Sequence, residues 1–497
     1  MSNYTLSIDQ GTSSTRSIIF DKNFKIISTS ILEFNQIFPS DGYVEHKPEE
    51  IFETVLKTAQ IAIARANITF KNIVGIGIAN QRETTVLWNK ETGKPIYNAI
   101  VWQDRRTVSY CKSLVKKGLT KKIQSITGLV IDAYFSATKV KWILDNIKAA
   151  DQLLKEDKLL FGTIDTWVLW KLTEGRSHLT EATNASRTML YDIKKNTWSD
   201  ELLKLFNIPK KILPEVRDSA DKFGYTSLLG GKITIGGIAG DQQAATIGQA
   251  CFEEGSIKST YGTGCFMLMN TGNKFKISKN NLLSTIAYRL NGQTCYALEG
   301  SIFIAGAAVQ WLRDSLKMIR SAEETEDLYT QNDKSTQIYL VPAFVGLGAP
   351  YWDGEARGAI FGMTRNTGIA DFVKATIDSI AYQTKDLIVA MEKDSGFKIS
   401  NIKVDGGMVR NEQFLQFLSN ILISKCDRPK IIETTALGAA YLSGLTSGLL
   451  KDLSEISKKW QSDKVFQPKI HKKEVKYLYQ GWLKAVRKTI VKRNTEK

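Results

Sequence analysis

YTLSIDQGTSSTRSIIF, residues 4–20, is the stretch from which the rest of the chain can be interpreted. Two short apolar runs, residues 6–8 and 17–20, flank a polar turn that contains glycine, and this pattern predicts strand–turn–strand. The turn offers the carboxylate of Asp9, several hydroxyls and freed backbone N–H groups, and Arg16 follows shortly after it. These groups suit a polyphosphate with its metal ion, whereas an ordinary polar hairpin would fit this stretch equally well.

The length and composition are those of a globular protein with more than one domain. A chain of 497 residues predicts two or more domains, which we place at residues 1–249 and 250–497. With 43% hydrophobic and 24% charged residues, the chain can build an ample core. The net charge of +16 raises nucleic acid as a partner, but Lys and Arg are scattered among Asp and Glu. Since no nucleic-acid-binding signature appears, we expect no nucleic-acid partner.

Cysteine, histidine and hydropathy exclude several further classes. Five widely spaced cysteines without a C-x-x-C motif argue against a disulfide scaffold and a zinc site, and they fit a reducing compartment. Three histidines leave little room for a His-based metal centre. The N-terminus shows no secretory signal, and no apolar run reaches the roughly 18 residues that span a bilayer. We therefore expect a cytoplasmic protein with no integral membrane segment.

Apolar runs in the first half lead to residues with useful chemistry. Residues 73–79, IVGIGIA, predict a buried central strand, and Arg82 and Glu83 follow it, where ligands gather in open α/β sheets. A structural ion pair at the strand end is the alternative. Residues 233–239 form a similar run before Asp241, whose carboxylate could take a proton from a bound hydroxyl or cap the following helix. The two roles of this acid can coexist.

The second half repeats the opening pattern. Residues 256–269 predict strand, Gly/Thr-rich turn and strand, which indicates two related half-folds that face each other across a cleft. Residues 301–312 predict a helix whose small residues allow close approach by a ligand, or simply by another helix. Residues 402–411 predict a strand and a Gly-Gly turn that leads into a helix, whose N-terminus could bind an anion or a nucleotide.

These stretches together resemble the FGGY carbohydrate kinase family, and within it the members that phosphorylate glycerol. The resemblance runs essentially from end to end, through DQGTSSTR (9–16), GIANQRETTVLWNKETGKPIYNAIVWQDRR (77–106), YFSATKVKWILDN (134–146), GIAGDQQAA (237–245), STYGTGCFMLMN (259–270), ALEGSIFIAGAAVQWLRD (297–314), APYWDGEARGAIFGMTRNT (349–367) and VDGGMVRNEQFLQF (404–417). Several such strings in one order are far more specific than any single string. The resemblance implies an α/β fold of two ribonuclease-H-like domains, of the actin and hexokinase superfamily, that flank a catalytic cleft.

Carried over position by position, the resemblance also implies roles for individual residues, with ATP as the phosphoryl donor and Mg²⁺ as its metal ion. The glycerol pocket would consist of Arg82, Glu83, Trp102, Tyr134, Asp241, Gln242 and Phe266. The nucleotide would be held by Thr12, Ser13, Ser14, Arg16, Gly262, Thr263, Gly306, Gln310, Gly407 and Asn411. Asp241 would be the general base on the attacked hydroxyl, and Asp9 would lie near Mg²⁺. A homodimer or a homotetramer is the implied assembly.

Two other functions stay open from the sequence. The first is another FGGY kinase that acts on a pentulose or a sugar acid, although Arg82 and Glu83 together with Trp102 and Phe266 favour the small triol. The second is a non-catalytic, actin-like or chaperone-like ATP-binding protein, against which Asp241 argues.

One loop departs from the family pattern. Some bacterial members bind a regulatory sugar bisphosphate through a Gly-rich loop with an arginine, and here residues 229–232 end in Lys232. Lysine cannot reproduce the bidentate fork of arginine, so the resemblance does not carry this regulation over.

Overall fold

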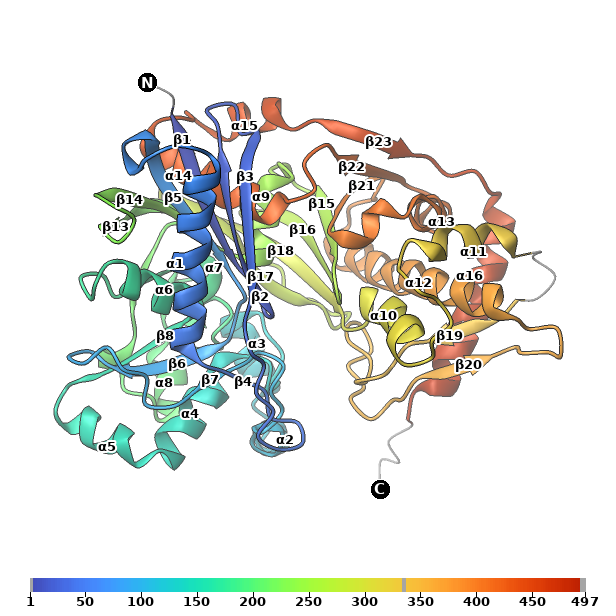
Figure 1. Ribbon diagram of the computed structural model, residues 1–497. Coiled ribbons are helices and arrows are strands. Elements are labelled where there is room, and N and C mark those ends of the chain that lie inside the picture. The colour runs from blue at the N-terminus through green and yellow to red at the C-terminus, as the bar shows by residue number, and fades with distance from the viewer. Residues whose placement is uncertain (1–2, 333–336, 492–497) are drawn as a thin grey trace.

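The computed structural model describes residues 3–332 and 337–491. The chain forms two α/β units side by side, each with a mixed sheet and helices packed against it (Figure 1). In this described part of the chain, no helix is both long enough and apolar enough to cross a membrane.

The sheet of the first unit has parallel strands at its centre and antiparallel strands at its edges. In spatial order it consists of β13 (Ala220–Thr226), β14 (Ile233–Gly240), β5 (Ile73–Asn80), β1 (Tyr4–Gln10), β2 (Ser14–Phe20) and β3 (Ile26–Glu33). The strands β14, β5 and β1 run parallel, and their apolar runs are buried because both faces are covered. The strands predicted at residues 6–8, 17–20, 73–79 and 233–239 are confirmed.

The sheet of the second unit repeats this arrangement. In spatial order it consists of β17 (Leu283–Leu290), β18 (Gln293–Ile302), β16 (Cys265–Gly272), β15 (Ile257–Tyr261), β21 (Asn401–Asp405), β22 (Lys425–Pro429) and β23 (Ser462–Phe466). The hairpin β15–β16 pairs antiparallel, and β15 pairs in parallel with a strand that comes much later in the chain, as β1 does with β5. The repeated hairpin that the sequence predicts is therefore present in both units.

Smaller sheets and many helices complete the units. The minor sheets contain β4 (Glu45–His46), β7 (Ala99–Ile100), β6 (Thr85–Asn89) and β8 (Leu159–Thr163), and the strand pairs β9 (Leu179–Glu181) with β12 (Glu215–Arg217), β10 (Tyr191–Asp192) with β11 (Thr197–Trp198), and β19 (Tyr339–Val341) with β20 (Ala359–Phe361). The helices of the first half are α1 (Pro48–Arg65), α2 (Val108–Lys116), α3 (Thr120–Thr127), α4 (Ser136–Asn146), α5 (Lys148–Lys155), α6 (Ile164–Leu172), α7 (Ala182–Ala185), α8 (Asp200–Phe206) and α9 (Asp241–Gly248). Those of the second half are α10 (Gly306–Asp314), α11 (Glu324–Gln331), α12 (Ile369–Ser395), α13 (Glu412–Leu422), α14 (Thr434–Ser447), α15 (Leu453–Lys459) and α16 (Lys472–Thr489). Single turns of 3₁₀ helix lie at Phe70–Asn72, Lys210–Ile212 and Gly407–Arg410.

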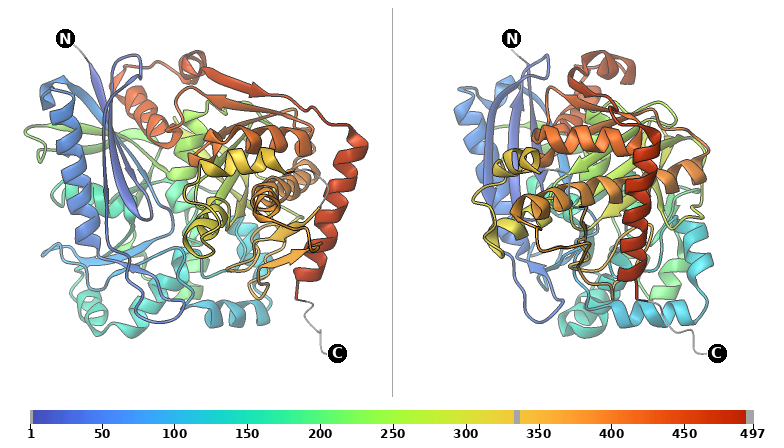
Figure 2. Two further views of the ribbon diagram at one scale, coloured as in Figure 1. Left: turned by 45° about the vertical axis from the view of Figure 1, so that its right-hand side comes forward. Right: turned by 90° about the vertical axis from the view of Figure 1, so that its right-hand side faces the viewer.

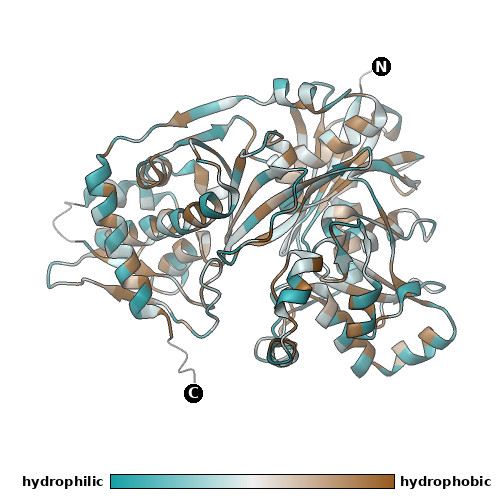
Figure 3. Cartoon of the chain, turned by 180° about the vertical axis from the view of Figure 1, so that it is seen from behind, coloured by the Kyte–Doolittle hydropathy of each residue, from teal (hydrophilic) through white to brown (hydrophobic). Residues whose placement is uncertain are grey.

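Helix α14 belongs to the second half of the sequence but packs on the sheet of the first unit (Figures 1 and 2). It crosses α9 at very short range, because each helix has a glycine at the crossing. A Cβ atom on Gly438 would lie 1.8 Å from the carbonyl oxygen of Ala244, and one on Gly248 would lie 2.0 Å from that of Thr434. Apolar residues of β2 and α14 join one buried cluster there, including Phe20. In Figure 3 much of the apolar colour lies along the central strands, as this packing requires.

One of two helix predictions in the second half needs correction. The helix predicted over residues 301–312 is wrong for its first five residues, because β18 continues to Ile302 and α10 begins only at Gly306. Ser301 and Ile302 pair with Phe266 and Cys265 of β16, and this long-range pairing holds them in the sheet. The helix predicted after the Gly-Gly turn is confirmed as α13, and the 3₁₀ turn Gly407–Arg410 lies between the two.

Candidate active site

Two parallel strands of the first unit deliver the central residues of the site. Strand β5 ends at Asn80 and β14 ends at Gly240, and these two residues are register partners in the sheet. Arg82 follows the first strand, and Asp241 follows the second as the first residue of α9. Because the carboxyl ends of neighbouring parallel strands meet at one edge, the side chains converge there.

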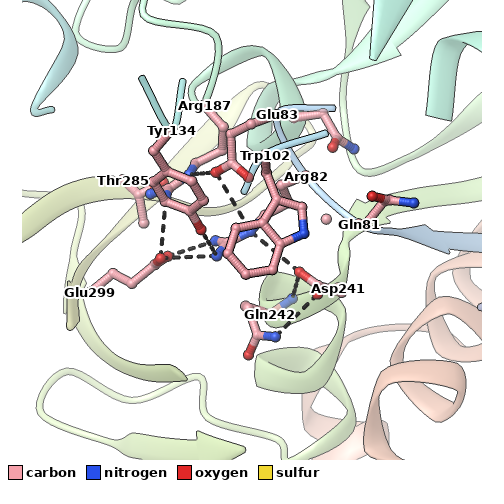
Figure 4. A network of polar contacts seen from close by, with 12 residues as sticks. Gln81, Arg82, Glu83, Trp102, Tyr134, Arg187, Asp241, Gln242, Thr285 and Glu299 are labelled. Atoms are coloured by element: carbon pink, nitrogen blue, oxygen red, sulfur yellow. Dashed lines mark hydrogen bonds and ion pairs between the residues drawn. The ribbon is translucent and has the colours of Figure 1, made fainter. Parts of the chain in front are cut away.

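Arg82 is the centre of a buried polar network (Figure 4). Its side chain is 2% exposed, and its Nε lies 3.3 Å from Oδ1 of Asp241. Its Nη1 and Nη2 donate to the two carboxylate oxygens of Glu299, at 2.6 and 2.9 Å. Nη1 also donates to Oε1 of Gln243 at 3.2 Å, and Nη2 lies 3.5 Å from the Tyr134 hydroxyl. The guanidinium is therefore held on several sides at once.

Glu83 is held as firmly as its neighbour. Its φ of 60° is unusual for a residue other than glycine, so the surrounding contacts must stabilise a strained backbone. Oε1 of Glu83 accepts a hydrogen bond of 2.6 Å from Nε of Arg187, and Nη2 of Arg187 lies 3.2 Å from Oε1 of Glu299. Arg82, Glu299, Arg187 and Glu83 thus form a chain of alternating charge that is almost wholly buried.

Glu83 and Glu299, the two acids of this buried network, differ in how their pKa values shift. Burial raises the pKa of Glu83 above its usual value, although Arg187 and Arg82 oppose the rise. Burial acts on Glu299 in the same direction, but Arg187 and Arg82 outweigh it and lower its pKa. Burial would also lower the pKa of Arg82, yet Glu299 and the other neighbouring groups raise it well above the usual value. Glu299 is therefore the carboxylate that is best matched to the two arginines.

Aromatic rings surround the polar groups. The Trp102 ring lies 5.5 Å from that of Tyr134 and 6.2 Å from that of Phe266, both edge to face. The guanidinium of Arg82 lies 5.8 Å from the Phe266 ring centre. The indole N–H of Trp102 donates to the Thr12 hydroxyl at 2.9 Å, which joins these rings to the opening hairpin.

Asp241 combines fixed geometry with access to solvent. Its side chain is 29% exposed, whereas those of Glu83 and Glu299 are 1% and 0% exposed. The backbone N–H of Gln242 donates to Oδ1 at 2.7 Å, and the Gln242 side-chain amide lies 3.2 Å from Oδ2. That amide is itself oriented by the buried amine of Lys258, which donates to its oxygen at 2.6 Å. The structure therefore brings together all the residues predicted for the glycerol pocket.

The opening hairpin places an acid and an arginine beside this network. Asp9, at the end of β1, is partly buried, and burial raises its pKa to about 6; Arg16 opposes the rise and Asp241 adds to it. Arg16 forms an ion pair with Glu433, the residue before α14. Ser13, at the tip of the turn, is exposed, so its hydroxyl is open to a ligand.

Turns of the second unit that were predicted to hold the nucleotide also meet. The backbone N–H of Gly306 donates to the carbonyl oxygen of Gly262 at 3.0 Å, and that of Ala305 donates to Thr263 at 2.9 Å. Gly406 has a φ of 91°, and a Cβ atom there would lie 2.5 Å from the Tyr261 carbonyl oxygen, so the Gly-Gly turn sits against this hairpin. Gly262, Thr263 and Gly407 are exposed at this junction.

The other two residues of that predicted set lie on the flanking helices. Gln310 is exposed on α10. The Asn411 side chain caps α13 by accepting from the N–H of Phe414 at 2.8 Å, and it donates to Thr325 at 3.1 Å.

Three buried charged residues of the site were not predicted from the sequence. Glu299 was a detectable signal, because it is a single acid within the apolar strand segment YALEGSI. Lys258 likewise interrupts the buried strand β15. Arg187 follows the short helix α7 in a polar segment, and nothing in its neighbourhood distinguished it from a surface arginine.

Known proteins resemble the chain over nearly its whole length. A profile of the FGGY family of carbohydrate kinases, N-terminal domain, matches residues 4–248, and the C-terminal domain profile matches residues 257–447. A glycerol kinase of Rhizobium meliloti (strain 1021) is 54% identical over 99% of this chain and 100% of its own length. A glycerol kinase of Fusobacterium nucleatum is 53% identical over 98% of this chain and 99% of its own length.

Solved structures agree with these sequence relatives. The crystal structure of Plasmodium falciparum glycerol kinase with ADP is 38% identical, with a TM-score of 0.91 and 99% of both chains covered. A ligand-bound xylulose kinase from Lactobacillus acidophilus, at 23% identity, a TM-score of 0.87 and 98% of both chains covered, shares the fold. The predicted two-domain α/β architecture is thereby confirmed. With matches to both domain profiles and to full-length relatives, the chain belongs to the FGGY family of carbohydrate kinases.

Proposed function

We propose that this kinase transfers the γ-phosphoryl group of ATP to glycerol and forms sn-glycerol 3-phosphate, with Asp241 as the general base. The observation that carries the proposal is the position of Asp241. Its partly exposed carboxylate lies 3.3 Å from a buried arginine and beside the aromatic rings. The full-length relatives named glycerol kinase, at 53–54% identity, support glycerol as the substrate.

The network suits a small triol. Glycerol has three hydroxyls and a narrow C–H face, so it needs several donors and acceptors beside apolar cover. Arg82 presents its Nε edge, and Asp241 and Gln242 present polar groups on the same side. Trp102 and Phe266 supply rings for the C–H face. A site whose buried polar groups need partners rejects analogues that leave them unpaired.

In the transfer itself, Asp241 accepts the proton of the attacking hydroxyl. The hydroxyl oxygen forms a bond to the γ-phosphorus, the bond from phosphorus to the bridging oxygen breaks, and ADP leaves with that electron pair. Proton transfer by a positioned carboxylate contributes about 10²–10⁴-fold in rate. Most of the remaining barrier in phosphoryl transfer is lowered by positioning and by charge stabilisation.

The nucleotide and its metal ion fit the residues that are present. The turns at Thr12, Gly262 and Gly407 would hold the phosphates through backbone N–H groups and hydroxyls. Mg²⁺ is commonly bound through one or two carboxylates together with substrate phosphates. Asp9 fits this role because it is a partly buried acid with a raised pKa, which a nearby cation would relieve. When bound, the ion would neutralise charge on the transferring group.

We also infer that the units divide near residues 249 and 250, that the enzyme works in the cytoplasm and that it is a homodimer or homotetramer. The buried, unpaired thiols of all five cysteines fit a reducing compartment. Light scattering on the purified full chain measures the assembly state, and a monomeric mass would contradict the assembly proposal.

ADP release measured with glycerol, xylulose, ribulose and gluconate tests the proposal. Glycerol is expected to give by far the highest kcat/KM. A preference for a pentulose or for gluconate would refute glycerol as the substrate. ATP turnover that does not depend on any of these acceptors would favour an actin-like or chaperone-like ATP-binding protein.

Asp241→Asn tests the base within the same assay. We expect the folded variant to keep its glycerol affinity and to lose turnover by about 10²–10⁴-fold, the usual contribution of a general base. Glycerol affinity can be followed by the shift in Tm that the ligand causes. Turnover close to that of the wild type would sink the assignment of Asp241.

A further inference from the structure

Glu299 reaches into the site of the first unit from the sheet of the second. It lies in β18, its side chain is 0% exposed, and its charged partners both come from the first unit. It accepts a two-pronged pair of hydrogen bonds from Arg82, at 2.6 and 2.9 Å, and lies 3.2 Å from Arg187. A fork of this kind fixes orientation as well as distance.

The geometry points to Glu299 as a positioning residue: it turns the guanidinium of Arg82 so that the Nε edge faces the acceptor site beside Asp241. This inference rests on the proposed glycerol kinase function, and it adds a residue of the second unit to substrate recognition in the first.

The distribution of donors on Arg82 supports this role. A guanidinium has five N–H groups in a rigid plane. Nη1 donates to Glu299 and Gln243, and Nη2 donates its shorter bond to Glu299. The Nε edge, which faces Asp241, is the edge that these partners leave for the site. Since the guanidinium plane is rigid, the carboxylate that binds its Nη1 and Nη2 edge determines where its Nε edge points.

Charge balance leads to the same residue. Arg82 and Arg187 carry two positive charges, and Glu83 and Glu299 carry two negative charges, so the buried group is neutral as a set. Asp241 lies outside this neutral set, with its Oδ1 3.3 Å from Nε of Arg82. Without Glu299, the two arginines would carry one positive charge in excess, and Asp241 and Glu83 would be the carboxylates left near Arg82 to balance it. A buried ion pair that loses one partner leaves the other uncompensated.

Glu299→Gln is the first test, because it keeps the shape and removes the charge and one acceptor. The KM for glycerol should rise about 10–100-fold, as expected for a misplaced binding group, and the KM for ATP should stay within about twofold. An unchanged glycerol KM would overturn the inference. A loss of glycerol and ATP affinity to the same extent would also overturn it, since that pattern reports a general disturbance.

Glu299→Asp separates position from charge. It keeps the negative charge, and with it the balance of the buried group, but withdraws the carboxylate by one methylene. Positioning predicts a folded protein with a raised glycerol KM, and this variant decides the question if Glu299→Gln fails to fold. A wild-type glycerol KM in Glu299→Asp would show that charge alone suffices and would refute positioning.

Asp386→Asn is the matched control. Asp386 is also a buried acid of the second unit, but it accepts from Tyr479 and Trp482, away from the site. Its variant should keep both KM values. The wild-type measurement separates the two levels of inference: a wild type that ignores glycerol refutes the proposed function, whereas an active wild type with an unaffected Glu299→Gln refutes only the role of Glu299.

Discussion

Replacement of Asp9 by asparagine should stabilise the protein while it removes activity. The pKa of Asp9 is raised from 3.8 to about 6, chiefly by burial. A raised pKa in the folded state means that the unfolded chain loses its proton first. Stability is therefore lost as the pH rises from about 4 to about 6, and it stays lost above that range. Asparagine carries no charge at any pH and removes this cost.

The magnitude follows from the shift. At about 1.4 kcal/mol per pKa unit, the cost is about 3 kcal/mol at pH 8, and the same linkage gives about 1 kcal/mol at pH 4.5. These values are upper bounds, because Asp9 is partly open to solvent, which screens its charge. For an unfolding unit of about 250 residues, a gain of this size corresponds to a rise in Tm of about 5 °C.

Thermal unfolding followed by circular dichroism measures the effect in the full chain without nucleotide. Asp9→Asn should raise the Tm at pH 8 and raise it clearly less at pH 4.5, while ATP turnover with glycerol is lost. Asp41→Asn, at an exposed acid of the same unit, is the control and should change the Tm at neither pH. No gain in the Tm of Asp9→Asn at pH 8, or the same gain at both pH values, would contradict a burial cost at Asp9.

Three further changes probe other parts of the structure. Arg82→Ala should raise the KM for glycerol and cost about 3–5 kcal/mol of stability, because it strips Glu299 of its fork; an unchanged KM in the kinetic assay would contradict its role. Gly438→Ala should destabilise the fold by about 1–3 kcal/mol or more, since the new methyl group meets the Ala244 carbonyl oxygen, whereas Gly368→Ala, in open space, should cost little in the same denaturant titration. Burial lowers the pKa of Lys139 to about 8, so stability should rise between about pH 8 and 10 as the folded state releases that proton first. Lys139→Met should lack this increment, and a rise of equal size in the variant would assign it to other groups.

The strands could be predicted because their signals are local. β-Branched residues and a Gly-containing turn indicate the hairpin of Tyr4–Gln10 and Ser14–Phe20, and β-branched residues also indicate the strand Ile73–Asn80. Residues 301–305 could not be assigned in this way. Their side chains suit a helix and a strand equally, and the pairing of Ser301 and Ile302 with β16, about 36 residues earlier, places these two residues in the sheet.

Most residues of the site could be predicted from the sequence, but the ion pairs between them could not. Arg82 and Asp241 follow apolar runs, and the family resemblance pointed to the rings around them. The ion pairs of Arg82 with Glu299 and of Arg187 with Glu83 join residues 217 and 104 positions apart. No local pattern reports such pairs, because they form only once distant segments of the chain have folded together.

The placement of α14 has a consequence for synthesis of the protein on the ribosome. The strands of the first sheet have all been made by residue 240, but the helix that packs on that sheet begins at Thr434. Throughout the translation of the intervening residues, Phe20 and its neighbours in the apolar cluster lack their partners from α14. The nascent first half therefore carries an uncovered apolar face that can bind chaperones or aggregate, and it closes only when the last tenth or so of the chain emerges.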